Sequence, residues 1–83
     1  MKIYAIRDLN VGFNSPFVES GDAVAIRGFS YAMNNNDMMG FAPKDFDLYY
    51  LGEYDTEKGL IDAVDLPVLV IHGSEVFAND RTK

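Results

Sequence analysis

The sequence contains no cysteine, which excludes disulfide bonds, thiolate metal sites and a thiol nucleophile. It also has no apolar run near the roughly 20 residues that a membrane-spanning helix needs, and Val68–Ile71 is among its longest. Basic residues are scarce: seven Lys and Arg stand against thirteen Asp and Glu, for a net charge of −6. Because proteins held on DNA mainly through phosphates usually carry a basic stripe, this balance disfavours broad phosphate binding.

The residues that are present describe one small globular domain. An apolar fraction of 48%, with 13% aromatic residues over 83 positions, is typical of a folded chain. Arg7 and Asp8 interrupt the apolar residues near the start, so no signal peptide is predicted and we expect a soluble, intracellular protein. The domain is predicted to span residues 1–78, with residues 79–83 as a frayed tail.

The first half of the chain predicts one strand and one helix. Residues 2–7 are β-branched and aromatic, as in a strand, and residues 10–16 hold loop-forming residues. Ser20 is the predicted helix cap, with Asp22 in the first turn, and residues 34–36 end the helix. Residues 37–43 are predicted to form an apolar loop. One apolar stripe at spacings of three and four runs along this helix: Ala25, Ile26, Phe29, Ala32 and Met33.

After Asp45 the apolar spacing changes to two, which predicts a meander of two or three strands. Residues 46–54 alternate, residues 55–59 form a turn ending on Gly59, and residues 60–64 return antiparallel. Pro67 is predicted to interrupt the sheet before a short strand over residues 68–72, and Val76 and Phe77 to anchor the end. The fold class is therefore α+β: a small antiparallel sheet of three to four strands, in the order β-α-β-β-β, with one helix on one face.

A single helix covers one sheet face, and alternation predicts a second apolar face that needs cover. We expect a homodimer that packs this face against itself around a two-fold axis. The alternative is a monomer whose residues 38–41 and 76–77 fold over the face. The predicted dimer or partner surface consists of Tyr4, Ile6, Tyr49 and Leu51. These residues alternate along the strands with Ile3, Ala5, Leu48 and Tyr50, which are expected on the other face.

No complete catalytic or metal site is visible in the sequence. His72 is the single histidine, and Ser74 near it does not make a triad. Asp45 and Asp47 would share one strand face, but further cation ligands are lacking. We therefore expect a protein that is not an enzyme and that holds neither a metal nor a cofactor.

Aromatic residues on the predicted strands offer a surface on which single-stranded bases stack. Arg27 lies off the apolar stripe, so we expect it at the surface, where replacement by alanine changes stability by well under ~1 kcal/mol. The acids crowd residues 45–65, a run that repels phosphate. We expect it to be a solvated sheet surface that keeps the protein soluble, and the alternative is that it faces a basic partner. The candidate nucleic-acid-binding residues are Lys2, Tyr4, Arg7, Arg27 and Lys44.

Three segments together resemble a known family. They are the strand at Lys2-Ile-Tyr4, the helix at Asp22–Phe29, and Leu48–Asp55 followed by Thr56–Gly59. Their order and spacing resemble the small nonstructural protein of gokushovirus-type microviruses, which are tailless phages with circular single-stranded DNA genomes. The likeness runs from residue 1 to about residue 76.

The resemblance implies a phage-encoded, non-virion protein of the bacterial host cytoplasm. Members are usually described as DNA-binding, or as acting in the switch from duplex replication to single-stranded genome synthesis. The expected function is a non-enzymatic accessory that contacts single-stranded DNA or the replication complex, through the viral replication initiator or host replication proteins. The alternative is an acidic protein-interaction module that modulates a host factor or an assembly intermediate. We expect no membrane partner in either case.

Overall fold

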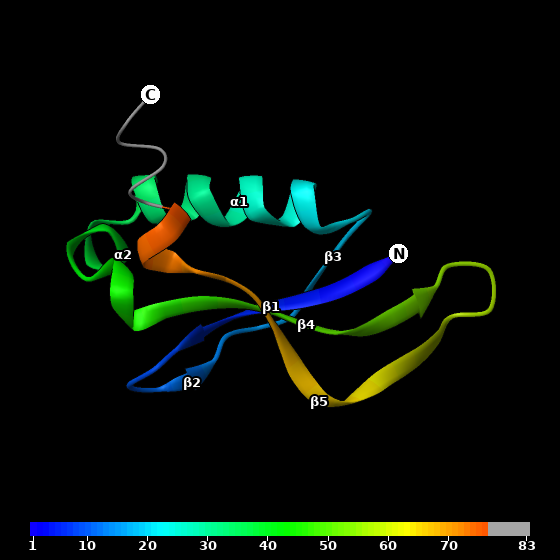
Figure 1. Cartoon of the computed structure of the whole chain (residues 1–83). Helices are drawn as coiled ribbons and strands as arrows, with labels where there is room; N and C mark the ends of the chain where they lie inside the picture. The colour runs from blue at the N-terminus through cyan, green and yellow to red at the C-terminus, as the bar shows by residue number, and fades with distance from the viewer. Residues whose placement is uncertain (77–83) are drawn as a thin grey trace.

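The computed structural model describes residues 1–76, which build a curled antiparallel sheet with helices against one face (Figure 1). The α+β class is confirmed, but the order β-α-β-β-β and the single helix are wrong, since three strands precede the helix and a second helix follows it. The elements are β1 (Lys2–Asp8), β2 (Gly12–Phe13), β3 (Phe17–Glu19), α1 (Asp22–Asn35), α2 (Asp37–Phe41), the 3-10 turn η1 (Pro43–Asp45), β4 (Phe46–Asp55) and β5 (Leu60–His72). The predicted end of the domain at residue 78, the predicted tail 79–83 and Phe77 lie outside the described residues.

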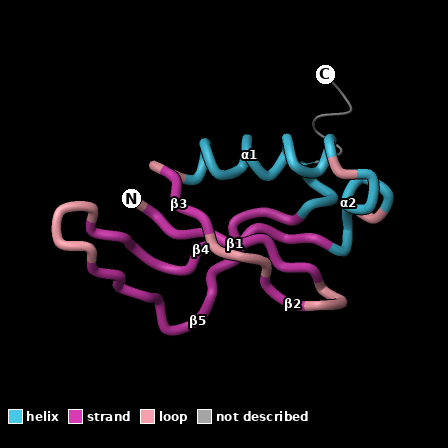
Figure 2. Tube along the Cα trace, turned by 180° about the vertical axis from the view of Figure 1, so that it is seen from behind, coloured by secondary structure: helices cyan, strands magenta, loops and turns pink. Residues whose placement is uncertain are grey.

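The central strand β1 has neighbours on both edges. The strand order is β2-β1-β4-β5, and β3 also pairs with β1, so β2 and β3 share the edge of β1 that β4 does not occupy (Figure 2). All pairings are antiparallel. The short strand β2 lies within residues 10–16, where the sequence predicts a loop, and β3 follows in residues for which no strand is predicted. Two or three residues are too few to show an alternating pattern.

The strand β5 runs past Pro67 without a break, contrary to the prediction of two separate strands. The register changes instead: Tyr50 pairs with Val68 and Gly52 with Ala63, so residues 64–67 lie opposite Leu51 alone. Proline is tolerated there because β5 is the outer strand of the sheet, where an amide hydrogen bond to a further strand is not needed.

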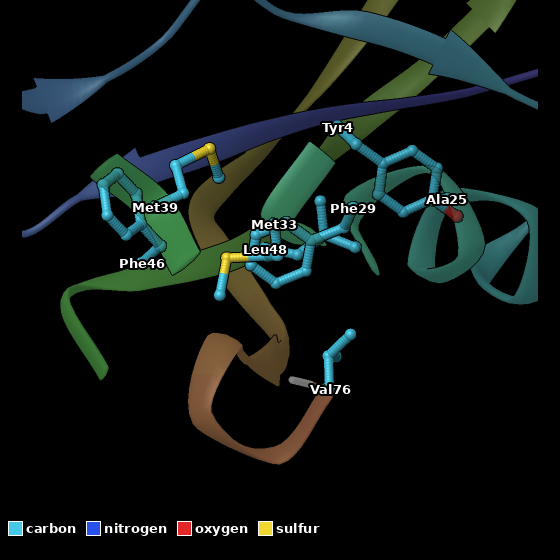
Figure 3. Packing of buried hydrophobic residues seen from close by; sticks show 8 residues of the cluster. All are labelled: Tyr4, Ala25, Phe29, Met33, Met39, Phe46, Leu48 and Val76. Atoms are coloured by element: carbon cyan, nitrogen blue, oxygen red, sulfur yellow. The ribbon is translucent and has the colours of Figure 1, made fainter. Parts of the chain in front are cut away.

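The hydrophobic core lies between α1 and the sheet (Figure 3). The predicted stripe is confirmed for Ala25, Phe29 and Met33, which are buried, whereas Ile26 and Ala32 are half-buried at its margin. The predicted anchor at Val76 is also confirmed, since only 4% of this residue is exposed. The core cluster comprises Tyr4, Ala25, Phe29, Met33, Met39, Phe46, Leu48 and Val76.

Tyr4 lies in this core, which corrects the prediction that it belongs to a second face. It is fully buried, it pairs with Tyr50, and its hydroxyl donates to Asp22 Oδ1 at 2.5 Å. Burial first, and then this hydrogen bond, raise the pKa of Tyr4. The phenol is buried without penalty because its polar end has a partner at the start of α1.

The two helix ends differ in how well the sequence predicts them. The helix α1 ends at Asn35, as predicted, but its cap is Gly21 rather than Ser20, and no side chain caps it. The predicted loop over residues 37–43 is helical instead: the Asn36 side chain accepts a hydrogen bond from the Met39 amide and so starts α2. Among residues 1–76 the structure contains no helix long and apolar enough to cross a membrane.

Candidate functional site

The face of the sheet away from α1, here called the open face, carries a cationic and aromatic cluster. Arg7 pairs with Phe13 on β2 and with Asp47 on β4. Its guanidinium carbon lies 5.7 Å from the centre of the Phe13 ring and 6.0 Å from that of Tyr49. The two rings meet edge-on with centroids 5.3 Å apart. We call Arg7, Phe13 and Tyr49 the arginine–aromatic cluster.

The side chains of the cluster are accessible to solvent. Phe13 is 47% exposed, and both Arg7 and Tyr49 are half-buried. Cation–π contact holds the guanidinium against the rings while leaving its N–H groups able to bind an anion. The register places Leu69, 41% exposed, opposite Tyr49 on the same face. The arrangement is a small platform with one firmly held positive charge.

A charged row continues from the cluster across two further strands. Arg7 on β1, Asp47 on β4 and His72 on β5 are successive register partners. Asp47 is buried, and its Oδ1 lies 2.9 Å from His72 Nδ1. The hydrogen bond and the attraction of Asp47, with a smaller contribution from Glu75, raise the pKa of His72, although burial opposes the shift. His72 is therefore a positive group over a wider pH range than a free histidine.

The His72–Asp47 pair predicts a pH-dependent stability. Because the folded-state pKa of His72 is raised above the ordinary histidine value of about 6.5, this stabilising contribution is full below that value. It is lost as pH rises through the folded-state pKa. We expect the urea midpoint of unfolding to fall between about pH 6 and pH 8.

The variant His72→Gln is the control for this prediction, because glutamine keeps a polar side chain without a titrating group. The urea midpoint of this variant should change less over the same pH range. An equally steep fall in His72→Gln would mean that another group carries the pH dependence.

The predicted basic candidates do not come together. Lys2 lies at the other end of β1 from Arg7, with its Nζ 5.6 Å from the centre of the Tyr50 ring. Arg27 is exposed on α1, in agreement with its predicted place at the surface, and so belongs to the helix layer. Lys44 is exposed in η1, whose Asp45 carbonyl accepts from the Leu9 amide, so it lies near the Arg7 end of β1.

The predicted dimer surface divides between the two faces. Tyr4 and Ile6 pair with Tyr50 and Leu48 and pack in or against the core, so their placement on the second face is wrong. Tyr49 lies on the open face. Leu51 is the extra residue at a register shift in β4 and is half-buried.

Asp45 and Asp47, which the sequence predicts on one strand face, do not share a face in the structure. Asp45 lies in η1 rather than on a strand face beside Asp47, and its Oδ2 lies 3.4 Å from the Asn10 side-chain nitrogen. Within residues 1–76, no three His, Cys, Asp or Glu side chains are grouped to hold a metal ion.

Sequence reasoning missed Phe13, the exposed ring of the cluster. The residue falls among turn-forming residues, and its two-residue strand has no alternation to reveal a face. The closeness of Phe13 to Tyr49 depends on the pairing of β1 with both β2 and β4. The one sequence signal is the occurrence of Phe13 and Phe17 in a segment otherwise typical of a loop.

Comparison with known proteins gives a family and no close relative. No curated protein and no solved structure matches the chain. The family model described as Phage ORF5 protein matches residues 1–76, the same residues that form the sheet and its helices. This match covers nearly the whole sequence, and the chain therefore belongs to the Phage ORF5 protein family.

Proposed function

We propose that this phage protein is a non-enzymatic accessory in the replication of a microvirus-type single-stranded DNA genome, in the cytoplasm of the bacterial host. It contacts single-stranded DNA, or the viral initiator and host replication proteins assembled on it, through the arginine–aromatic cluster. The observation that carries the proposal is the guanidinium of Arg7 held against two rings on an open sheet face. Such a platform stacks bases and meets one phosphate.

The charge of the protein limits how this contact is made. With a net charge of −6, the chain as a whole repels a phosphate backbone. Arg7 is the one base of the cluster, and Asp47 separates it from His72 on the same face, so only a short stretch of DNA is held electrostatically. Stacking on Phe13 and Tyr49 supplies the remaining affinity, and stacking is worth about 1–3 kcal/mol per base. We expect weak, sequence-tolerant binding.

Fluorescence anisotropy with a labelled oligothymidine at low and moderate salt tests the proposal. We expect binding at low salt that weakens only gently as salt rises, because few phosphates are neutralised. Tyr49→Leu keeps an apolar side chain and removes the stacking ring, so it should weaken binding by about fivefold or more. Arg7→Gln should weaken binding and flatten the salt dependence.

Arg27→Gln is the matched control, since it removes an exposed arginine from the helix layer. Its affinity should stay within about twofold of the parent, a difference of under 0.5 kcal/mol. Circular dichroism of each variant checks that the fold is kept. Absence of binding at low salt, or equal losses for Arg7→Gln and Arg27→Gln, would remove direct DNA contact through this cluster.

We also propose a homodimer, formed through a smaller part of the open face than the dimer surface that the sequence predicts. Leu69, opposite Tyr49 in the cluster, and Val18, opposite Ile3 farther along β1, are each 41% exposed on the open face, and a second copy would cover them. DNA and a second copy then compete for one face. Light scattering at micromolar concentration should show two chains that separate when oligothymidine is added, and a mass of one chain throughout would exclude the dimer.

A further inference from the structure

The distal part of the β4–β5 hairpin extends beyond the helix layer and is not part of the core. We call residues 52–67 the hairpin arm. Its turn reaches past the start of α1 in both views (Figures 1 and 2), and none of its residues belongs to the core cluster or packs against it. Large apolar side chains are nevertheless exposed along its β5 side: Leu60 at 62%, Ile61 at 68% and Leu66 at 76%.

One edge of the arm is paired and the other is open. On the β4 side, Tyr54 exchanges hydrogen bonds with Met1: the Tyr54 amide donates to the Met1 carbonyl at 2.8 Å, and the terminal amine donates back at 3.2 Å. On the other side, β5 is the last strand of the sheet among the described residues. Residues 60–63 stay in regular register with β4, so their outward backbone groups are arranged to accept another strand.

The charges of the arm decide which strand fits. It carries Glu53, Asp55, Glu57, Asp62 and Asp65 but a single base, Lys58. Asp55 is used within the turn, where its carboxylate accepts from the Glu57 and Lys58 amides. Glu53 and Asp62 are direct register partners, and like charges in that position are destabilising. Glu53 has Lys2 opposite it on β1 and the Tyr50 hydroxyl as a donor, whereas Asp62 faces the open edge. A positive side chain beside Asp62 would relieve this repulsion.

We infer that the outer edge of β5, over residues 60–64, binds an extended protein segment in which basic and apolar residues alternate. The basic side chains of the bound segment lie beside Asp62 on one face of the sheet. Its apolar side chains cover Ile61 and Tyr54, which are register partners on the opposite face. A DNA backbone is repelled by the acids of the arm. A second copy is disfavoured because antiparallel pairing centred on residue 62 sets Asp62 against its own copy. The surface is separate from the arginine–aromatic cluster, so the inference stands without the DNA proposal.

A fluorescein-labelled peptide of alternating lysine and valine is the probe. We expect an anisotropy rise with the full chain at low salt, and slower amide hydrogen exchange confined to the outward amides of residues 60–64. Asp62→Lys should weaken binding by about tenfold or more, because it sets like charges against each other. The milder Asp62→Asn should weaken it in the same direction.

Asp37→Lys makes the same change of charge at an exposed acid in α2, away from the arm, and should leave the affinity within about twofold. Equal losses for Asp37→Lys and Asp62→Lys would show attraction to the whole acidic chain and overturn the inference. Equal binding of a glutamate–valine peptide would do the same, as would exchange protection of residues 60–64 by oligothymidine. Loss of oligothymidine binding in Tyr49→Leu with peptide binding kept would confirm two independent surfaces.

Discussion

Phe29→Ala should lower the free energy of unfolding by about 3–5 kcal/mol, the largest loss expected for a single truncation in this chain. The side chain is fully buried between α1 and the sheet, beside Tyr4, Met33 and Leu48 (Figure 3). Its removal leaves a cavity that a helix packed along the sheet fills only partly. Because the whole free energy of unfolding of a small domain is about 5–15 kcal/mol, the variant should unfold at a much lower urea concentration.

Phe41→Ala is the matched control for this prediction. It makes the same chemical change at a residue that is 90% exposed on α2. Its urea midpoint should correspond to a change of less than about 0.5 kcal/mol. Similar losses for the two variants would mean that α1 does not pack on the sheet in the arrangement described.

Gly52→Ala should destabilise the protein by more than about 2 kcal/mol, because backbone conformation and space both require glycine here. Gly52 has φ of +153°, which side chains rarely adopt. An added Cβ would lie 2.4 Å from the Asp62 carbonyl oxygen and 2.8 Å from the Ala63 Cα. Both contacts are with backbone of β5, so the hairpin arm would have to separate from β4.

Gly28→Ala provides the comparison, since it adds the same methyl group to an exposed position within α1 with nothing within 4 Å. Alanine is the better helix former, so this variant should gain about 0.5–1 kcal/mol. Urea unfolding of the two variants should therefore move in opposite directions. A Gly52→Ala midpoint at or above that of the parent would contradict the close approach of β4 and β5.

Local patterns were enough to predict the elements whose signal is long. The helix over residues 22–35 appears in the sequence as a stripe with a period near 3.6, and its Phe29 and Met33 are buried as expected. The turn at residues 55–59 is likewise predicted, with Gly59 at a φ of +71°. Elements of two to five residues leave no such period, and β2, β3 and α2 were therefore missed.

The assignment of faces needed the tertiary structure. Alternation shows that Tyr4 and Ile6 share a face, but it does not show whether that face meets the helix or solvent. The register Tyr4–Tyr50 and the hydrogen bond to Asp22 decide it, and both join residues distant in sequence. The same dependence explains the candidate site: Arg7 was a candidate from its charge, whereas its place against Phe13 and Tyr49 follows from strand pairing.

The sequence by itself determined the α+β class, the main helix with its buried stripe, the acidic balance and the absence of cysteine chemistry. Each of these follows from composition or from a period repeated over several turns. The tertiary structure alone decided which sheet face α1 covers, the long bent edge strand β5 and the pairing of His72 with Asp47. The physical reason is that strand register and long-range contacts are made between separate segments, and only the packing of the whole chain selects among the arrangements each segment allows.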